Sequence, residues 1–288
     1  MTDIPELLAG AWQALSRAGY DDGKLCSILS QITEHDDSMA VLSRLKSEAG
    51  VPAGDDSVER LMLAISAAES LPRISSLALH AGSRKLLEND LRAFLSDSSR
   101  TRMRYSDFVR AAKIATLRRF PAGPMEWEIS GIPRSWLLKP RPGGMLQLGA
   151  FIARRLKGFR PCFFMHVAPR PRNRALILEN EVMSSYYRMA RSMQLQPDIL
   201  GIVASAWFYD PRAVFDNPWL EPLSRPLTEN GGFIVPLGPA DATSGMLEGN
   251  PDRRRRFEDG SLSYRIGLAI WPRACAISWA DAHPEYDR

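Results

Sequence analysis

Hydrophobic residues recur at helical spacing through the first 118 positions of the chain. The clearest examples are Leu8, Trp12, Leu15, Leu25, Leu29 and Ile32. Residues three or four positions apart share one face of a helix, so each such run predicts a helix with one apolar side. We therefore expect residues 1–118 to fold as a helical domain.

The pattern changes after residue 118, where proline and glycine divide the chain into short apolar runs. Runs of strand length occupy residues 125–129, 135–138, 160–167, 232–237 and 264–271. Helical spacing returns in residues 146–156, 219–227, 252–257 and 273–280. Several connections are too short for a crossover helix, which indicates a sheet of mixed strand direction. The prediction is an α/β (α+β) fold, with a helical N-terminal region followed by a mixed-sheet α/β domain over residues 119–288.

The stretch from residue 174 to residue 209 reads as strand, helix and strand. Apolar segments 174–178 and 199–209 flank an amphipathic helix that begins near Glu181. The apolar face of that helix holds Val182, Tyr186, Met189 and Met193. Two buried strands joined by a helix predict a βαβ unit, which places the core of the second domain.

This order of elements resembles the second half of a GNAT-type acyltransferase. In that family a central strand leads into a helix that binds the acyl-CoA pyrophosphate, and the next strand splays away to admit the pantetheine. The family carries the motif Q/R-x-x-G-x-G/A ahead of that helix, where this chain has Glu179-Asn180-Glu181-Val182-Met183-Ser184. The resemblance implies an acyl or aminoacyl transferase whose cofactor is an anionic donor such as acyl-CoA.

The composition, 45% hydrophobic and 24% charged, is that of a soluble globular protein. The cysteines Cys26, Cys162 and Cys275 form no close pair, which is typical of reduced thiols in the cytoplasm. The longest apolar run, residues 199–208, is too short to span a bilayer as a helix, and the first residues lack a signal-peptide pattern. We therefore expect a cytoplasmic protein with no membrane partner.

Charge is divided unevenly along the chain. Residues 1–100 carry 10 Lys and Arg against 15 Asp and Glu, a net of −5, whereas residues 101–288 carry 27 against 18, a net of +9. Arginine dominates the second part, and its planar fork suits carboxylates and phosphates. One interpretation is an anionic small molecule or a nucleic acid bound by the second domain. The other is solvated surface together with pairing to the acidic first domain.

Four arginines are the candidate ligand-binding residues. Arg188 and Arg191 lie one turn apart on the polar side of the helix in the βαβ unit. Arg134 and Arg254, the latter from a run of four arginines, lie in segments that could approach them. The competing interpretation of Arg188 and Arg191 is structural, namely pairing with nearby carboxylates.

Three residues are candidates for the catalytic base: Glu128, His166 and Tyr209. His166 follows Cys162 on the same face of a predicted strand at a separation of about 13 Å, too far to share a metal ion. The other histidines lack ligand spacing, so we expect no metal site. For His166 the alternative is a buried, hydrogen-bonded histidine, and for Tyr209 it is core packing.

Three functions remain open from the sequence. The first is the GNAT-like acyltransferase. The second is a non-catalytic protein that binds an anionic ligand or partner, and the third is a nucleic-acid-binding regulator, favoured only by the basic second half. Similarity of fold does not choose among them, because function depends on the chemistry of a site.

Overall fold

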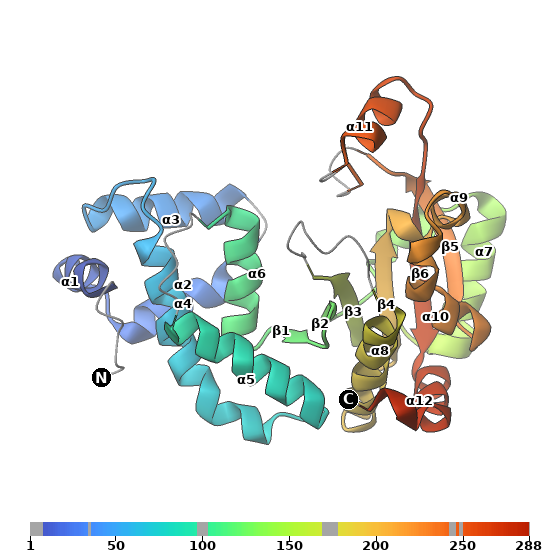
Figure 1. Cartoon of the computed structure of the whole chain (residues 1–288), viewed down its shortest axis with the longest axis horizontal. Coiled ribbons are helices and arrows are strands. Elements are labelled where there is room, and N and C mark those ends of the chain that lie inside the picture. The colour runs from blue at the N-terminus through green and yellow to red at the C-terminus, as the bar shows by residue number, and fades with distance from the viewer. Residues whose placement is uncertain are drawn as a thin grey trace. The chain divides into compact units, whose positions relative to one another are not determined.

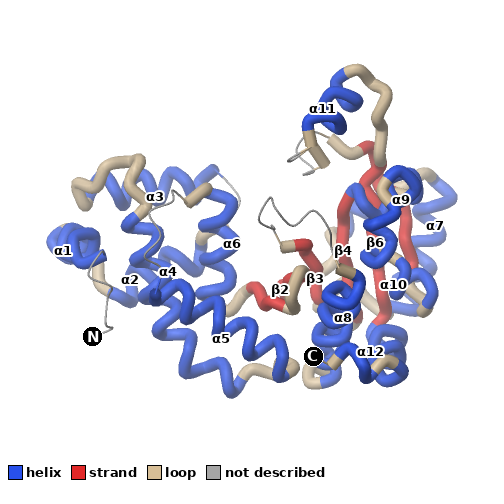
Figure 2. Tube along the Cα trace, viewed as in Figure 1, coloured by secondary structure: helices blue, strands red, loops and turns tan. Residues whose placement is uncertain are grey.

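A computed structural model describes residues 8–33, 36–96, 103–168, 178–241, 246–247 and 250–287. The chain divides into two compact units, one of residues 1–77 and 83–121 and the other of residues 78–82 and 122–288 (Figure 1). Up to the end of α6, the described residues form helices and loops, and the sheet follows (Figure 2). The chain therefore has the predicted α+β fold, a helical region followed by a mixed sheet with helices.

The first unit is built around one apolar helix, α4 (Ser57–Ser70). The unit also contains α1 (Ala9–Arg17), α2 (Asp22–Gln31), α3 (Asp36–Glu48), η2 (Leu71–Ser76), α5 (Ala81–Ser96) and α6 (Tyr105–Ala115). Side chains all around α4 are buried, among them Leu61, Met62 and Ile65. A helix that is apolar on every side needs partners on every side, and α1, α2 and α6 all contact it.

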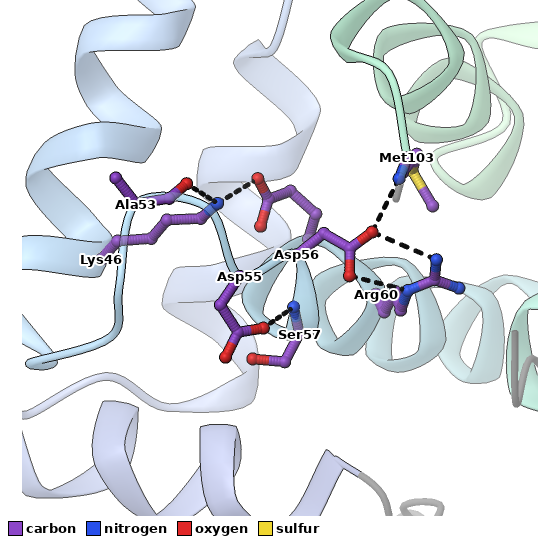
Figure 3. A network of polar contacts seen from close by, with 8 residues as sticks. Lys46, Ala53, Asp55, Asp56, Ser57, Arg60 and Met103 are labelled. Carbon is purple, nitrogen blue, oxygen red and sulfur yellow. Dashed lines mark hydrogen bonds and ion pairs between the residues drawn. The ribbon is translucent and has the colours of Figure 1, made fainter. Parts of the chain in front are cut away.

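A network of ion pairs and hydrogen bonds surrounds the first turn of α4 (Figure 3). The ammonium of Lys46, 7% exposed, lies 2.5 Å from a carboxylate oxygen of Glu59. The carboxylate of Asp56 accepts hydrogen bonds from the Arg60 guanidinium at 3.1 Å and from the backbone N–H of Met103 at 2.7 Å. Burial by itself raises the pKa of Asp56, but these donors outweigh it, so that its pKa lies below the ordinary value.

Among the described residues the sheet has six strands in the order β1-β2-β3-β4-β6-β5, and β2 to β6 belong to the second unit. The strands are β1 (Arg119–Pro121), β2 (Met125–Ser130), β3 (Cys162–Val167), β4 (Gly201–Ala206), β5 (Phe233–Pro239) and β6 (Arg265–Pro272). β3 and β4 are parallel, whereas β2 with β3, β4 with β6 and β5 with β6 are antiparallel. The predicted mixed sheet is confirmed.

Helix α8 (Glu179–Gln194) lies between β3 and β4 in the sequence, so β3, α8 and β4 form the βαβ unit. The first strand of that unit is therefore β3. The strand predicted at residues 174–178 falls almost entirely on residues 169–177, outside the described residues, and Leu178 immediately precedes α8.

Helices cover both faces of the sheet. On one face, Leu148 of α7 (Pro142–Phe151) packs with Ile152 and Leu156 of the π-helical continuation η4 (Ile152–Leu156) against Val203 and Ile270. On the other face, the ring of Tyr186 in α8 meets Trp271 edge-on at 5.4 Å. Consecutive residues of a strand point to opposite faces of the sheet, so Ile270 faces the α7 layer and Trp271 faces the α8 layer.

Short helices complete the second unit. They are η3 (Arg134–Leu138), η5 (Trp207–Tyr209), α9 (Pro211–Asp216), η6 (Pro218–Leu223), α10 (Arg225–Glu229), α11 (Pro251–Glu258), α12 (Arg273–Ala282) and η7 (Pro284–Tyr286). Among the described residues, no helix combines the length and the apolar character needed to cross a membrane.

The structure differs from the prediction at residues 135–138 and at the end of the strand predicted over residues 199–209. Residues 135–138 form the 3-10 helix η3, in which the Trp136 N–H donates to the Pro133 carbonyl at 2.9 Å. Strand β4 ends at Ala206, and residues 207–209 form another 3-10 turn, η5. In both places the backbone of a short apolar run forms local 3-10 hydrogen bonds instead of bonds to a neighbouring strand. Hydrophobicity alone does not distinguish these two structures.

The apolar face predicted for α8 is confirmed, since Val182, Tyr186, Met189 and Met193 are all 0% exposed. The polar side of α8 is also largely buried. Ser184 is 4% exposed there, and the hydroxyl of Ser192, 0% exposed, accepts the backbone N–H of His80 at 2.9 Å. Segment 78–82 thus packs on α8 within the second unit.

We expect Met189→Ala to lower the free energy of unfolding by about 2–5 kcal/mol, because it opens a cavity in a closed core. Urea unfolding followed by tryptophan fluorescence measures this, since six of the seven tryptophans lie in the second unit. Leu195→Ala, at a side chain 54% exposed, is the control and should stay within about 0.5 kcal/mol of the parent. Equal effects for the two variants would contradict this packing.

Asp56→Asn should destabilise the first unit at neutral pH and flatten its acid response. A carboxylate whose folded pKa is depressed stabilises the protein above its unfolded pKa of about 4, and that contribution is lost as the pH falls through the folded pKa. Thermal melts followed by circular dichroism between pH 2 and pH 7 test this. A variant that loses stability below about pH 4 as steeply as the parent would show that Asp56 is not responsible.

Candidate functional site

The antiparallel pairing of β2 with β3 brings two of the predicted catalytic residues together. Glu128 lies opposite Phe164, and His166 lies two residues farther along β3, so the two side chains share one face of the sheet. Nε2 of His166 lies 2.6 Å from Oε1 of Glu128. Both side chains are partly exposed, 28% for His166 and 21% for Glu128. A histidine held by a carboxylate and open to solvent is an arrangement suited to proton transfer.

Aromatic rings border this pair. The Phe164 ring lies 5.3 Å from the His166 ring, and Trp136 of η3 lies 6.2 Å from Phe164. The ammonium of Lys139 lies 5.5 Å above the Trp136 ring. The Phe164 ring packs against one side of the His166 ring, and Trp136 packs against Phe164 from the layer formed by η3 and α7.

A second carboxylate, Glu126, belongs to the same face and was missed in the sequence. It lies directly opposite His166 in the register of β2 and β3, and it is 1% exposed. The signal was the spacing Glu126-x-Glu128 on a predicted strand, because residues two apart on a strand share a face.

The pair stands near the end of β3, where β3 and β4 part. The registered pairs between the two strands are Phe163 with Ile202 and Phe164 with Val203. Each strand continues for three more residues, β3 paired to β2 and β4 paired to β6. The sheet is therefore closed at the beginning of β3 and β4 and open beyond Phe164, on the His166 side.

Tyr209, the third predicted base, lies in η5 and is 2% exposed. Burial, together with the neighbouring Tyr186, raises the pKa of Tyr209 well above its ordinary value, so the phenol keeps its proton at neutral pH. The structure places it in the core, away from solvent.

Arg188 is tied to its own unit. Its guanidinium donates from Nη1 to the Ala122 carbonyl at 2.7 Å, and its side chain packs against two glycines. A Cβ on Gly82 would lie 2.9 Å from Nε, and one on Gly123 would lie 3.2 Å from Nη1. Glycine at these positions leaves the space that the arginine occupies, and burial lowers the pKa of Arg188.

Arg191 binds the last long helix of the unit. Its Nη1 lies 2.5 Å from a carboxylate oxygen of Asp281, and its Nη2 donates to the Ala280 carbonyl at 3.1 Å. The guanidinium also lies 4.9 Å from the centre of the Tyr187 ring. The carboxylate partner is thus in α12, and α8 places both Arg188 and Arg191 on the layer opposite Glu128 and His166.

Arg134 and Arg254 lie in two further places. Arg134 is exposed beside the Phe159 ring, 5.9 Å from its centre, and lines a hollow of about 330 Å³ together with Arg160. Arg254 is exposed on α11, whereas its neighbour Arg253 is held 4.6 Å above the Trp207 ring. The four predicted ligand-binding arginines therefore do not converge on one point.

Within the described part of the chain, no three His, Cys, Asp or Glu side chains gather closely enough to hold a metal ion. Cys162 is buried at the start of β3, and burial raises its thiol pKa to about 12. That thiol is therefore not a ready nucleophile.

No protein-family model matches the chain, and no characterised protein matches it in sequence. A solved structure is similar in fold, that of an acyltransferase in complex with decanoyl-CoA. The TM-score is 0.50 at 12% sequence identity, over 91% of this chain and 78% of that chain. The fold of this chain is therefore similar to that of an acyltransferase.

We expect Arg188→Ala to lower the free energy of unfolding by about 1.5–3 kcal/mol, because a partly buried charged donor leaves a carbonyl without its partner. Arg191→Ala should cost about 1 kcal/mol, since its ion pair is partly exposed. Arg254→Ala, on an exposed side chain, is the matched control and should stay within about 0.5 kcal/mol of the parent.

Urea unfolding of these variants, with and without CoA, separates the two interpretations of the arginines. An Arg188→Ala protein as stable as the parent, but no longer stabilised by CoA, would assign Arg188 to ligand binding.

Proposed function

We propose that this protein is a GNAT-like acyltransferase that takes its acyl group from an anionic thioester donor of the acyl-CoA type. The carrying observation is the Glu128–His166 pair, 2.6 Å apart and partly exposed, beside the point where two parallel strands separate. The similarity in fold to an acyltransferase solved with decanoyl-CoA supports the choice of reaction class.

In this proposal His166 is the general base. Glu128 accepts the N–H of Nε2 and holds the tautomer whose lone pair is on Nδ1. Nδ1 takes the proton of an attacking amine or hydroxyl as its N or O bonds to the thioester carbonyl carbon. The carbon–sulfur bond then breaks, the thiolate takes the proton back from His166, and an amide or ester and a free thiol leave.

The separation of β3 and β4 supports the use of a thioester with a long arm. Beyond Phe164 the facing edges of the two strands are not paired with each other. A pantetheine arm carries amide groups, and an extended chain with amide groups can pair with an open strand edge. N–H groups on that edge of β3 would also stabilise the oxyanion that forms on the carbonyl oxygen.

The remaining site predictions take defined roles here. Arg134 and Arg254 are the exposed cations that could meet the phosphates of the donor. Arg188 and Arg191 also remain predicted phosphate-binding residues, in addition to the structural contacts that they make. Tyr209 stays a prediction for the base, and its burial, which raises the pKa of its phenol, favours core packing instead.

A non-catalytic binding protein is the second candidate. Its support is the hollow lined by Arg134, Phe159 and Arg160, in which the Arg134 guanidinium lies over the Phe159 ring. Such a hollow suits a small anion with an apolar part.

We expect His166→Ala to lower the rate of thiol release from decanoyl-CoA about 100-fold or more, in a screen of amine and hydroxyl acceptors. Glu128→Gln should lower the rate about tenfold or more, since it keeps the shape but loses the negative charge that supports His166 while it holds the transferred proton. A thiol-reactive dye follows the reaction.

The matched controls are His283→Ala and Glu229→Gln in the same unit, which should keep the parent rate. Full activity in His166→Ala would remove the base from this proposal. Stabilisation by decanoyl-CoA in a thermal-shift assay, without thiol release for any acceptor, would favour the non-catalytic candidate; a ligand at about 100 times its Kd adds about 2.7 kcal/mol.

A further inference from the structure

The layer of η3, α7 and η4 has an unusual charge pattern. Between Ser130 and Ala168 the chain has seven Lys and Arg and not one Asp or Glu. Six of these cations flank α7, and all six are exposed: Arg134, Lys139 and Arg141 before it, and Arg154, Arg155 and Lys157 after it. Like charges without carboxylates between them in the sequence create a positive field around α7.

Two large apolar side chains are exposed in the same layer. Leu138 at the end of η3 is 74% exposed, and Leu146 in α7 is 78% exposed. Leu148 faces the core, whereas Leu146, Ala150 and Arg154, each four residues apart, are all exposed and form the outward stripe. Exposed apolar residues rimmed by charges mark an interaction surface.

This layer adjoins the proposed catalytic pair. η3 and α7 are in contact, and Trp136 of η3 meets the Phe164 ring, which in turn meets the His166 ring. All of these residues belong to one face of the sheet, the face on which Glu128 and His166 lie. A partner bound at η3 would therefore lie beside Phe164 and His166, whereas Leu156 of η4 packs beside Gly201 at the beginning of β4.

We propose that the η3–α7–η4 layer is the docking surface for a small acidic carrier protein that presents the acyl group as a phosphopantetheine thioester. This inference rests on the proposed acyltransferase function and names the source of the donor. Four of the six flanking cations are arginines, whose forks match carboxylate side chains. A few apolar contacts inside a ring of charges is the usual anatomy of a protein interface.

A lipid surface fits the layer less well. A helix that lies in a membrane interface needs a continuous row of bulky apolar residues. The outward stripe of α7 has only Leu146, followed by Ala150 and Arg154. Vesicle binding is therefore an outcome of the test that would overturn the proposal.

The test uses the full chain and an acidic acyl carrier protein, prepared as the free holo form and as its decanoyl thioester. Calorimetry at low and high salt measures binding of the holo form. We expect salt-dependent binding that weakens about tenfold or more in Arg141→Glu with Arg154→Glu, and in Leu146→Ser alone. Arg17→Glu with Arg73→Glu, an equal change in net charge at exposed sites of the first unit, should change binding by less than about twofold.

Activity gives the second readout. The kcat/KM for the decanoyl carrier should fall about tenfold or more in the α7 variants, whereas kcat/KM for decanoyl-CoA should stay within about twofold. Circular dichroism melts confirm that each variant is folded, and Leu146→Ser serves if the double variant is not. The proposal is overturned if the variants bind the carrier like the parent, if the control weakens binding equally, or if the layer binds anionic vesicles but not the carrier.

Failure of this inference and failure of the proposed function are distinguishable. If decanoyl-CoA is consumed in a His166-dependent reaction but the carrier does not bind, the docking surface fails and the function stands. If the carrier binds through α7 but no thioester is consumed, the function fails and the surface remains as a binding site.

Discussion

The pairing of β3 is the constraint on which the second unit depends. β3 pairs with β2 along its whole length, but its registered pairs with the parallel strand β4 lie only at its beginning. The pairing of β3 with β2 brings Glu128 and His166 to the same face of the sheet, because side chains two residues apart on a strand point to one side. The pairing of β3 with β4 closes the sheet at one end and leaves it open at the other. The same alternation assigns Val203 and Ile270 to the α7 layer and Trp271 to the α8 layer.

Several arginine side chains of the second unit make structural contacts within that unit. Arg188 binds the Ala122 carbonyl, Arg191 binds Asp281, and Arg253 covers the Trp207 ring. A guanidinium can cross-link backbone and side chains and cover an aromatic face at the same time, so a positive net charge says little by itself about ligands. Among the residues that the structure describes, the positive charge that remains exposed and has no nearby carboxylates in the sequence is concentrated around α7.

The chain shares a fold with a solved acyltransferase although no family model matches its sequence, and this combination has a physical explanation. A fold needs apolar residues at the right spacing and turns at the right places, and many sequences meet those conditions. At 12% identity the shared architecture therefore carries no residue role with it. The chemistry must come from side chains such as His166 and Glu128, at positions where this chain has its own pattern.

The sequence by itself determined the helical first region, the mixed sheet that follows and the buried stripe of α8, because each depends on spacing within a few residues. It misread residues 135–138, where local hydrogen bonds of a 3-10 turn replace a strand. It identified Glu128 and His166 separately, 38 positions apart, but not as a pair. Only the tertiary structure decided that pairing, and only it separated Arg188 and Arg191 from the pair by placing them on the opposite face. Strand register and the choice of face are set by long-range packing, and a slip of one residue would reverse both.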